Sequence, residues 1–289
     1  MKKIVIATVL GLLISSQAVT QTFAATGDFL TDNDINRLSS FGFSQEEIQT
    51  FTPEEYAVFN EKNGYDTMGH VVEETTTFYK LEDGVTSAVS EQEAIEGAAE
   101  IEKSNSIISP MALPTDSVEK KGFIKMTLSV SKVLDSKGAW HGVYTLKNSF
   151  HWLANPTYKL TDVTGISINP NLTYIQDSEY GSYKTISAGV SKITDTYPLK
   201  ANKKDLSGIA FKVDLRTYTK DGSSSIGDHS GYVAFQVKKN SGTSTNAFGH
   251  YIHLYNTVNF GIDIKSGSIS VSGVTQQDAM DNTAVSWDI

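Results

Sequence analysis

The clearest pattern in the chain is an alternation of apolar and polar residues between Ala139 and Pro156. A period of two is typical of a β-strand that has one buried face and one face in water. The odd positions, Lys147 among them, are predicted to face water. The even positions are predicted to form the core face of a central strand, with Trp140, Tyr144, Leu146, Phe150 and Trp152.

The same alternation recurs in other segments of the second half, separated by turn residues: 123–133, 206–218, 231–239, 248–264 and 266–273. No amphipathic helix separates these segments, which disfavours a parallel α/β fold. In 248–264 the apolar residues hold the even positions, so Tyr251 and Tyr255 are expected to point outward. The pattern predicts an all-β antiparallel sandwich over residues 120–289.

The N-terminal half carries the signals of short helices instead. Ser44 stands three residues before Glu47, and Thr52 stands three before Glu55, so two capping boxes are predicted to open two helices. A hairpin around Asp83-Gly84 and a further helix after Ser90 follow. Apolar residues at roughly helical spacing are expected to form a small shared core: Leu30, Ile35, Leu38, Phe41, Phe43, Ile48, Phe51, Tyr56 and Phe59.

The predicted fold class is therefore α+β, a small acidic helical N-terminal module followed by an all-β antiparallel sandwich domain. Met1, Lys2 and Lys3, the short apolar run after them and the small residues around Ala24 are typical of a secretory signal peptide. No run is long enough to span a bilayer, so no transmembrane segment is expected. The predicted division is a signal peptide in 1–24, an acidic helical module with a short hairpin in 25–103, a linker in 104–119 and the β-sandwich domain in 120–289.

Charge is distributed unevenly between these parts. Residues 25–119 hold 20 acidic and 4 basic side chains, whereas residues 120–289 hold 13 acidic and 18 basic ones. One interpretation is an independent acidic unit that is well solvated. The other is a pro-segment or intramolecular partner that covers the basic β region until cleavage near Lys120-Lys121.

The segment SFGFSQEEIQTFTPEEY, residues 40–56, resembles the short helical modules near the N-termini of exported proteins from Gram-positive bacteria, many of them uncharacterised. The resemblance covers only a small part of the chain and rests on capping boxes and aromatic residues. It implies secretion from such a cell, and it carries no catalytic residues to transfer.

The sequence contains no recognisable catalytic or metal-binding motif. It has no cysteine, which excludes disulfides, thiolate metal sites and cysteine nucleophiles. His250 and His253 are three apart on a strand and point to opposite faces, so they cannot chelate one ion unless the strand carries a bulge. Asp228 and His229 are adjacent, which is no evidence of a catalytic triad. No metal, cofactor or catalytic residue is predicted.

Aromatic side chains are the better candidates for binding. Planar rings on a surface can stack on sugar rings while their polar tips form hydrogen bonds. The candidate ligand-binding residues are Tyr180 and Tyr183 in a predicted loop, with Tyr251, His253 and Tyr255 on the face of 248–264 that is expected to point outward.

These observations predict a secreted, non-enzymatic extracellular protein whose β-sandwich domain binds the cell envelope, a polysaccharide or another extracellular partner. A cell-wall polymer or polysaccharide is the expected partner, nucleic acid is not, and the oligomeric state stays open. Amphipathic strands rich in serine and threonine leave a β pore-forming toxin with an acidic pro-region as an alternative. A secreted hydrolase is the second alternative.

Overall fold

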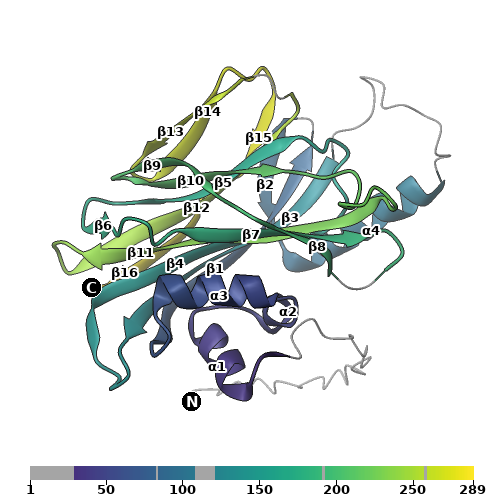
Figure 1. Ribbon diagram of the computed structural model, residues 1–289. Coiled ribbons are helices and arrows are strands. Elements are labelled where there is room, and N and C mark those ends of the chain that lie inside the picture. The colour runs from purple at the N-terminus through teal and green to yellow at the C-terminus, as the bar shows by residue number, and fades with distance from the viewer. Residues whose placement is uncertain (1–28, 83, 108–120, 191–192, 257–258) are drawn as a thin grey trace, which may run out of the picture.

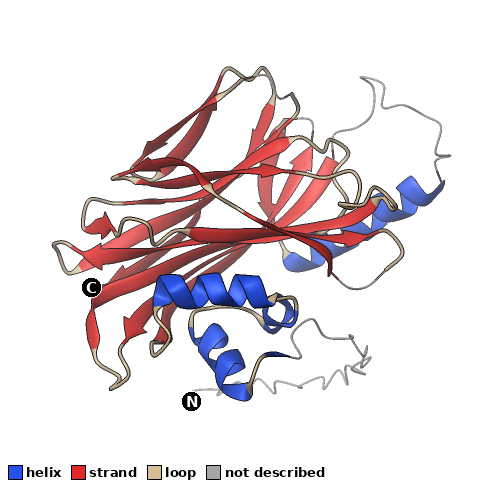
Figure 2. Cartoon of the chain, in the orientation of Figure 1, coloured by secondary structure: helices blue, strands red, loops and turns tan. Residues whose placement is uncertain are grey.

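Two antiparallel sheets pack face to face, and the N-terminal helices cover the outer face of the larger sheet (Figure 1). The computed structural model describes residues 29–82, 84–107, 121–190, 193–256 and 259–289. The predicted signal peptide, residues 108–119 of the predicted linker and Lys120 lie outside these ranges. The fold is α+β with a β-sandwich, and strands dominate it (Figure 2). No helix in the described ranges is long and apolar enough to cross a membrane.

The larger sheet, sheet A, has the order β2-β1-β3-β4-β11-β7-β8, with β6 paired to β11. The β1-β2 hairpin lies in this sheet because β1 pairs along its length with β3, from Met68 opposite Leu134 to Glu82 opposite Lys121. Whether the predicted N-terminal module folds on its own stays a prediction. The strands are β1 Met68–Glu82, β2 Val85–Val89, β3 Lys121–Leu134, β4 Trp140–Trp152, β6 Leu172–Tyr174, β7 Tyr180–Ser187, β8 Ile193–Pro198 and β11 Ile226–Lys239.

The smaller sheet, sheet B, has the order β15-β12-β5-β10-β9, with β16 paired to β12. A separate hairpin, β13 Gly261–Lys265 and β14 Ser268–Ser272, packs on its outer side. The strands of sheet B are β5 Thr161–Ile168, β9 Ala201–Asp205, β10 Gly208–Asp214, β12 Ser244–Leu254, β15 Gln277–Ala279 and β16 Thr283–Asp288.

The central strand predicted from Ala139 to Pro156 is β4, and its even positions do face the core between the sheets. Tyr144 and Leu146 pack there against Ile166 and Phe211 of sheet B. Trp140 is half-buried at the edge of this core. The alternation therefore predicted the inner face of β4 correctly.

The odd face of β4, predicted to lie in water, is covered by the helices. Thr145 is 2% exposed and Lys147 is 1% exposed. The covering elements are α1 Asp32–Ser40, α2 Gln45–Gln49 and α3 Pro53–Asn63, which we call the helical cover; α4 Glu91–Ile107 packs elsewhere, against β3 and β1. The prediction failed because alternation shows that two faces differ, and not whether a second layer covers the polar one.

The apolar residues of the helical cover share a core with sheet A. Phe43, Phe51 and Phe59 pack on Tyr180 and Tyr232. Both predicted capping boxes are present, at Ser44–Glu47 and Thr52–Glu55. The helical core and the outer face of the sheet therefore form one apolar layer.

The segment 248–264, predicted as one strand, is divided between β12, which ends at Leu254, and β13, which begins at Gly261. Its odd residues face the core between the sheets, so the predicted outward face is wrong: Tyr251 is fully buried. Its even residues Ile252 and Leu254 pack under the β13-β14 hairpin. The hairpin hides the second apolar face, which is why periodicity alone assigned the two faces the wrong way round.

Candidate functional site

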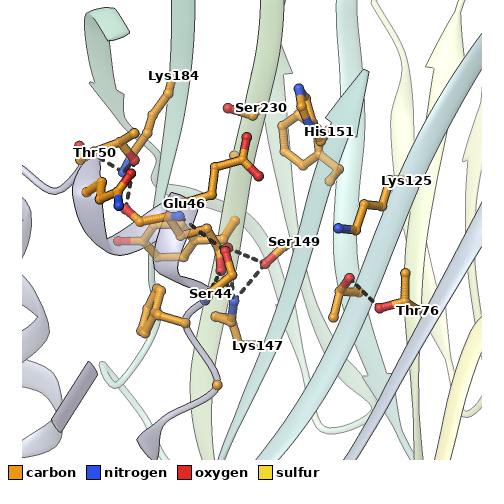
Figure 3. Close-up of a pocket in the computed structure, with 18 of the residues that line it drawn as sticks. Ser44, Glu46, Thr50, Thr76, Lys125, Lys147, Ser149, His151, Lys184 and Ser230 are labelled. Carbon is orange, nitrogen blue, oxygen red and sulfur yellow. Dashed lines mark hydrogen bonds and ion pairs between the residues drawn. The ribbon is translucent and has the colours of Figure 1, made fainter. Parts of the chain in front are cut away.

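A pocket of about 550 Å³ lies between α2 and the outer face of sheet A (Figure 3), and we call it the outer pocket. Strands β1, β3, β4, β11, β7 and β8 supply its floor, and α2 with its flanking residues supplies one wall. Its polar lining includes hydroxyl groups and charges of both signs: Ser39, Ser44, Thr50, Thr76, Thr127, Ser149, Ser230, Lys125, Lys147, Lys184, His151, Glu46, Glu47, Glu74 and Asp228.

One wall of the outer pocket is fixed by an ion pair between the partly buried Glu47 of α2 and the buried Lys147 of β4. The Lys147 ammonium donates hydrogen bonds to both carboxylate oxygens of Glu47, at 2.9 and 2.8 Å, and to the Ser149 hydroxyl at 2.8 Å. Ser149 in turn donates to Glu47 at 2.6 Å. Burial by itself would raise the pKa of Glu47, but the charge and hydrogen bonds of Lys147 outweigh it and the pKa is lowered.

A second buried ion pair lies between α3 and β7. The Lys184 ammonium is 3.2 Å from the Glu55 carboxylate and donates to the Thr50 hydroxyl at 2.9 Å. It also lies 4.8 Å from the centre of the Phe51 ring. Burial lowers the pKa of Lys184, although Glu55 opposes that shift.

Both glutamates have two roles. Each is the third residue of its helix and closes a capping box, in which its carboxylate accepts the N-cap backbone N–H, from Ser44 at 2.8 Å and from Thr52 at 3.0 Å. The same carboxylates meet the two lysines of the sheet. Residues that begin α2 and α3 therefore also attach them to sheet A.

The floor of the outer pocket contains one transverse row of polar groups that do not take part in these ion pairs. Lys125 on β3 is opposite His151 on β4, and His151 is opposite Ser230 on β11. Residues opposite each other in antiparallel strands point to the same face. We call Lys125, His151 and Ser230 the donor row.

His151 is held in this row by Asp228. Its Nε2 lies 3.0 and 3.1 Å from the two Asp228 carboxylate oxygens. Burial of the imidazole disfavours its charged form, but the hydrogen bonds and charge of Asp228 outweigh burial, so the pKa of His151 is raised. The carboxylate of Glu46 on α2 adds to this effect and points toward His151 and Ser230 (Figure 3).

None of the five residues predicted to bind a ligand lines the outer pocket. Tyr180 is buried under the helical cover and Tyr183 is buried between the sheets, where its hydroxyl lies 2.6 Å from Nδ1 of His229. Tyr251 and His253 both form hydrogen bonds with the buried Asp162 carboxylate, at 2.7 and 2.9 Å. Tyr255 is half-buried against Tyr158.

Tyr180 and Tyr183 lie on β7, not in the predicted loop, and face opposite sides of that strand. The predicted surface of exposed aromatic rings is not formed, because neighbouring layers cover Tyr180, Tyr183 and Tyr251. Within the described ranges, no group of three or more His, Cys, Asp or Glu side chains is arranged to hold a metal ion. His250 and His253 point to different partners, Ser167 and Asp162.

The sequence pattern did not predict the outer pocket or the residues that line it. Two signals could have indicated it: the opposite charges of the two halves, and the paired capping boxes at Glu47 and Glu55. Neither signal identifies which lysines the glutamates meet, because the contacts are about a hundred residues apart in sequence.

No protein-family model matches the chain, and no curated protein matches it. Among solved structures, it is similar to the C-terminal domain of the Streptococcus agalactiae AgI/II polypeptide BspA, at 6% identity and a TM-score of 0.28, over 56% of this chain and 58% of that one. Clostridium perfringens delta-toxin matches at 8% identity and a TM-score of 0.25, over 61% of this chain and 90% of that one. The collagen-binding domain of Erysipelothrix rhusiopathiae surface protein RspB matches at 6% identity and a TM-score of 0.25, over 57% and 65%. These scores are far below that of a shared fold, so the function is argued from the pocket.

Proposed function

We propose that this chain is a secreted extracellular binding protein that holds a polar, hydroxyl-bearing ligand, a segment of a cell-envelope polymer or polysaccharide, in the outer pocket. The observation that carries the proposal is the outer pocket of about 550 Å³, a volume within the range of ligand sites, whose lining combines apolar side chains with hydroxyl groups and charges. Lys125, Ser230 and Glu46 line it and take part in no hydrogen bond or ion pair with the described residues. Such groups are available to a ligand.

The polar groups of the lining provide the hydrogen-bond partners that a sugar needs. Hydroxyl groups of Thr76, Thr127 and Ser230 can donate and accept hydrogen bonds, and the Glu46 and Asp228 carboxylates can accept bonds from sugar hydroxyls. The signal-peptide pattern in residues 1–24 supports export to a compartment in which envelope polymers occur.

Retention on immobilised peptidoglycan, teichoic acid and a panel of polysaccharides tests the proposal. Purified mature protein should be retained by at least one polymer and eluted by its soluble fragments. Retention no greater than that of a neutral control protein on every resin would overturn it.

The same material separates the two alternatives. Release of reducing ends from the polymer that retains the protein would indicate a hydrolase, and release of dye from liposomes would indicate a pore-forming protein.

A further inference from the structure

We propose that the donor row is an anion subsite and that the ligand of the outer pocket is an anionic glycan, a sugar unit carrying a carboxylate or phosphate group. This inference rests on the proposed binding function and specifies its ligand.

The three side chains of the donor row lie side by side on the floor of the outer pocket. Lys125, His151 and Ser230 are direct neighbours across β3, β4 and β11, and they point to the same face. Side chains in such positions have Cβ atoms about 5 Å apart. One anionic group above this row can therefore accept hydrogen bonds from the Lys125 ammonium and the Ser230 hydroxyl. His151 can add a third from Nδ1 when the ring is protonated, because Asp228 already holds its Nε2.

Of the three lysines that line the outer pocket in the described part of the chain, only Lys125 is free to pair with a charged ligand. Lys147 and Lys184 also line the outer pocket, but Glu47 and Glu55 neutralise them. Lys125 has no carboxylate partner among the described residues; its ammonium lies 6.0 Å from the centre of the Phe78 ring. Lys125 is thus the lysine of this pocket that a ligand can neutralise.

The charged groups that face His151 define the rest of the ligand. Asp228 on β11 and Glu46 on α2 are anionic, and Lys125 on β3 is cationic. Asp228 favours the imidazolium form, but both carboxylates repel an inorganic anion. A sugar unit removes this conflict, because its hydroxyls can donate to the carboxylates while its acidic group meets the donor row.

A matched pair of ligands tests the inference. Oligogalacturonate and its methyl ester differ in charge and share the same sugar, so calorimetric titration into the full mature chain compares the acid with its neutral form. We expect the acid to bind about tenfold more tightly. Poly(glycerol phosphate), titrated in the same way, distinguishes a phosphate-bearing polymer from a carboxylated one as the source. Inorganic phosphate should not displace either polymer.

Lys125→Met should abolish the preference for the acid and leave ester affinity within about twofold, whereas Lys125→Arg should retain the preference. Lys238→Met, at the exposed end of β11, makes the same charge change away from the pocket and should behave as wild type. Thermal unfolding of each variant checks the fold. If acid and ester bind equally, or if Lys125→Met keeps the preference, the anion subsite is wrong while the binding function stands. If neither form of galacturonate and no phosphate polymer binds, the anionic ligand is overturned, and the polymer resins then decide the binding function separately.

Discussion

Glu47, the third residue of α2, is bound through both carboxylate oxygens by the ammonium of Lys147, which lies on the central strand a hundred residues later. A glutamate that begins a helix thereby fastens that helix to the sheet. Glu55 repeats the arrangement with Lys184. The acidic N-terminal region is therefore an integral layer of the molecule, and the outer pocket exists because of it.

The Glu47–Lys147 pair should be strongly cooperative. Lys147→Met leaves the partly buried Glu47 carboxylate without its cation, and Glu47→Gln leaves the fully buried Lys147 ammonium without its anion. Each change should lower the free energy of unfolding, the second by about 3 kcal/mol. The double variant should cost much less than the sum, since it leaves neither charge unpaired. Urea unfolding of the four proteins measures the coupling.

An exposed pair supplies the control for that cycle. Lys265 and Asp263 are 3.6 Å apart with side chains 76% and 60% exposed, so Lys265→Met should change stability by no more than about 0.5 kcal/mol. If the losses in unfolding free energy caused by Glu47→Gln and Lys147→Met simply add in the double variant, the two side chains are not coupled and the proposed cooperativity is wrong.

Removal of the helical cover should destabilise the sheets. A chain that begins at Met68 exposes Tyr180, Tyr232 and Ala234, and it leaves Lys147 and Lys184 without their glutamates. We expect such a chain to aggregate or to bind a hydrophobic dye, and to unfold at a lower urea concentration. A monomeric fragment as stable as the full mature chain would show that the sheets do not need the helical cover. The predicted cleavage near Lys120-Lys121 would also remove β1 and β2 from sheet A, and mass spectrometry of culture supernatant tests it separately.

Stability should decline in mild acid because of buried neutral histidines. Burial lowers the pKa of His250 from 6.5 to about 4. Below pH 6.5 the unfolded chain takes up a proton that the folded chain does not, so stability is fully present above pH 6.5 and is lost as pH falls toward 4. His250→Gln should show a shallower decline in urea unfolding over this interval, and an unchanged slope would contradict the assignment.

His151 should titrate in the opposite sense. Asp228 raises its pKa, so its contribution to stability is present below the unfolded value and is lost as pH rises through the folded one. An NMR titration should give His151 a pKa above 6.5, and Asp228→Asn should lower it. A pKa that the Asp228 change leaves unaltered would show that the carboxylate does not hold the imidazolium.

Local patterns predicted the elements of this fold well. Alternation identified β4 and its inner face, and capping boxes identified the starts of α2 and α3, because both signals act between residues close in sequence. They predicted the layers less well. Tyr251 and His253 were expected in water, but sheet A covers their face of β12. The opposite face of β12 is apolar as well, because the β13-β14 hairpin packs on it.

The candidate site depended on information that periodicity does not contain. Lys147 occupies a polar position of a strand and is buried, since a distant helix brings a carboxylate to it. The row of Lys125, His151 and Ser230 requires the register of three strands from three parts of the chain. The sequence indicates that opposite charges could meet, and the fold decides which ones do.

The most direct test of ligand binding in the outer pocket is to fill this pocket with a larger side chain and to measure the affinity for the polymer that retains the wild-type protein. Ser230→Phe places a ring over the donor row, and Ser270→Phe places the same ring on the exposed face of β14. With both variants shown to be folded by circular dichroism, we expect Ser230→Phe to lose at least about tenfold in affinity and Ser270→Phe to bind as wild type. Undiminished binding by Ser230→Phe would place the ligand outside the outer pocket and overturn the proposed function of this pocket.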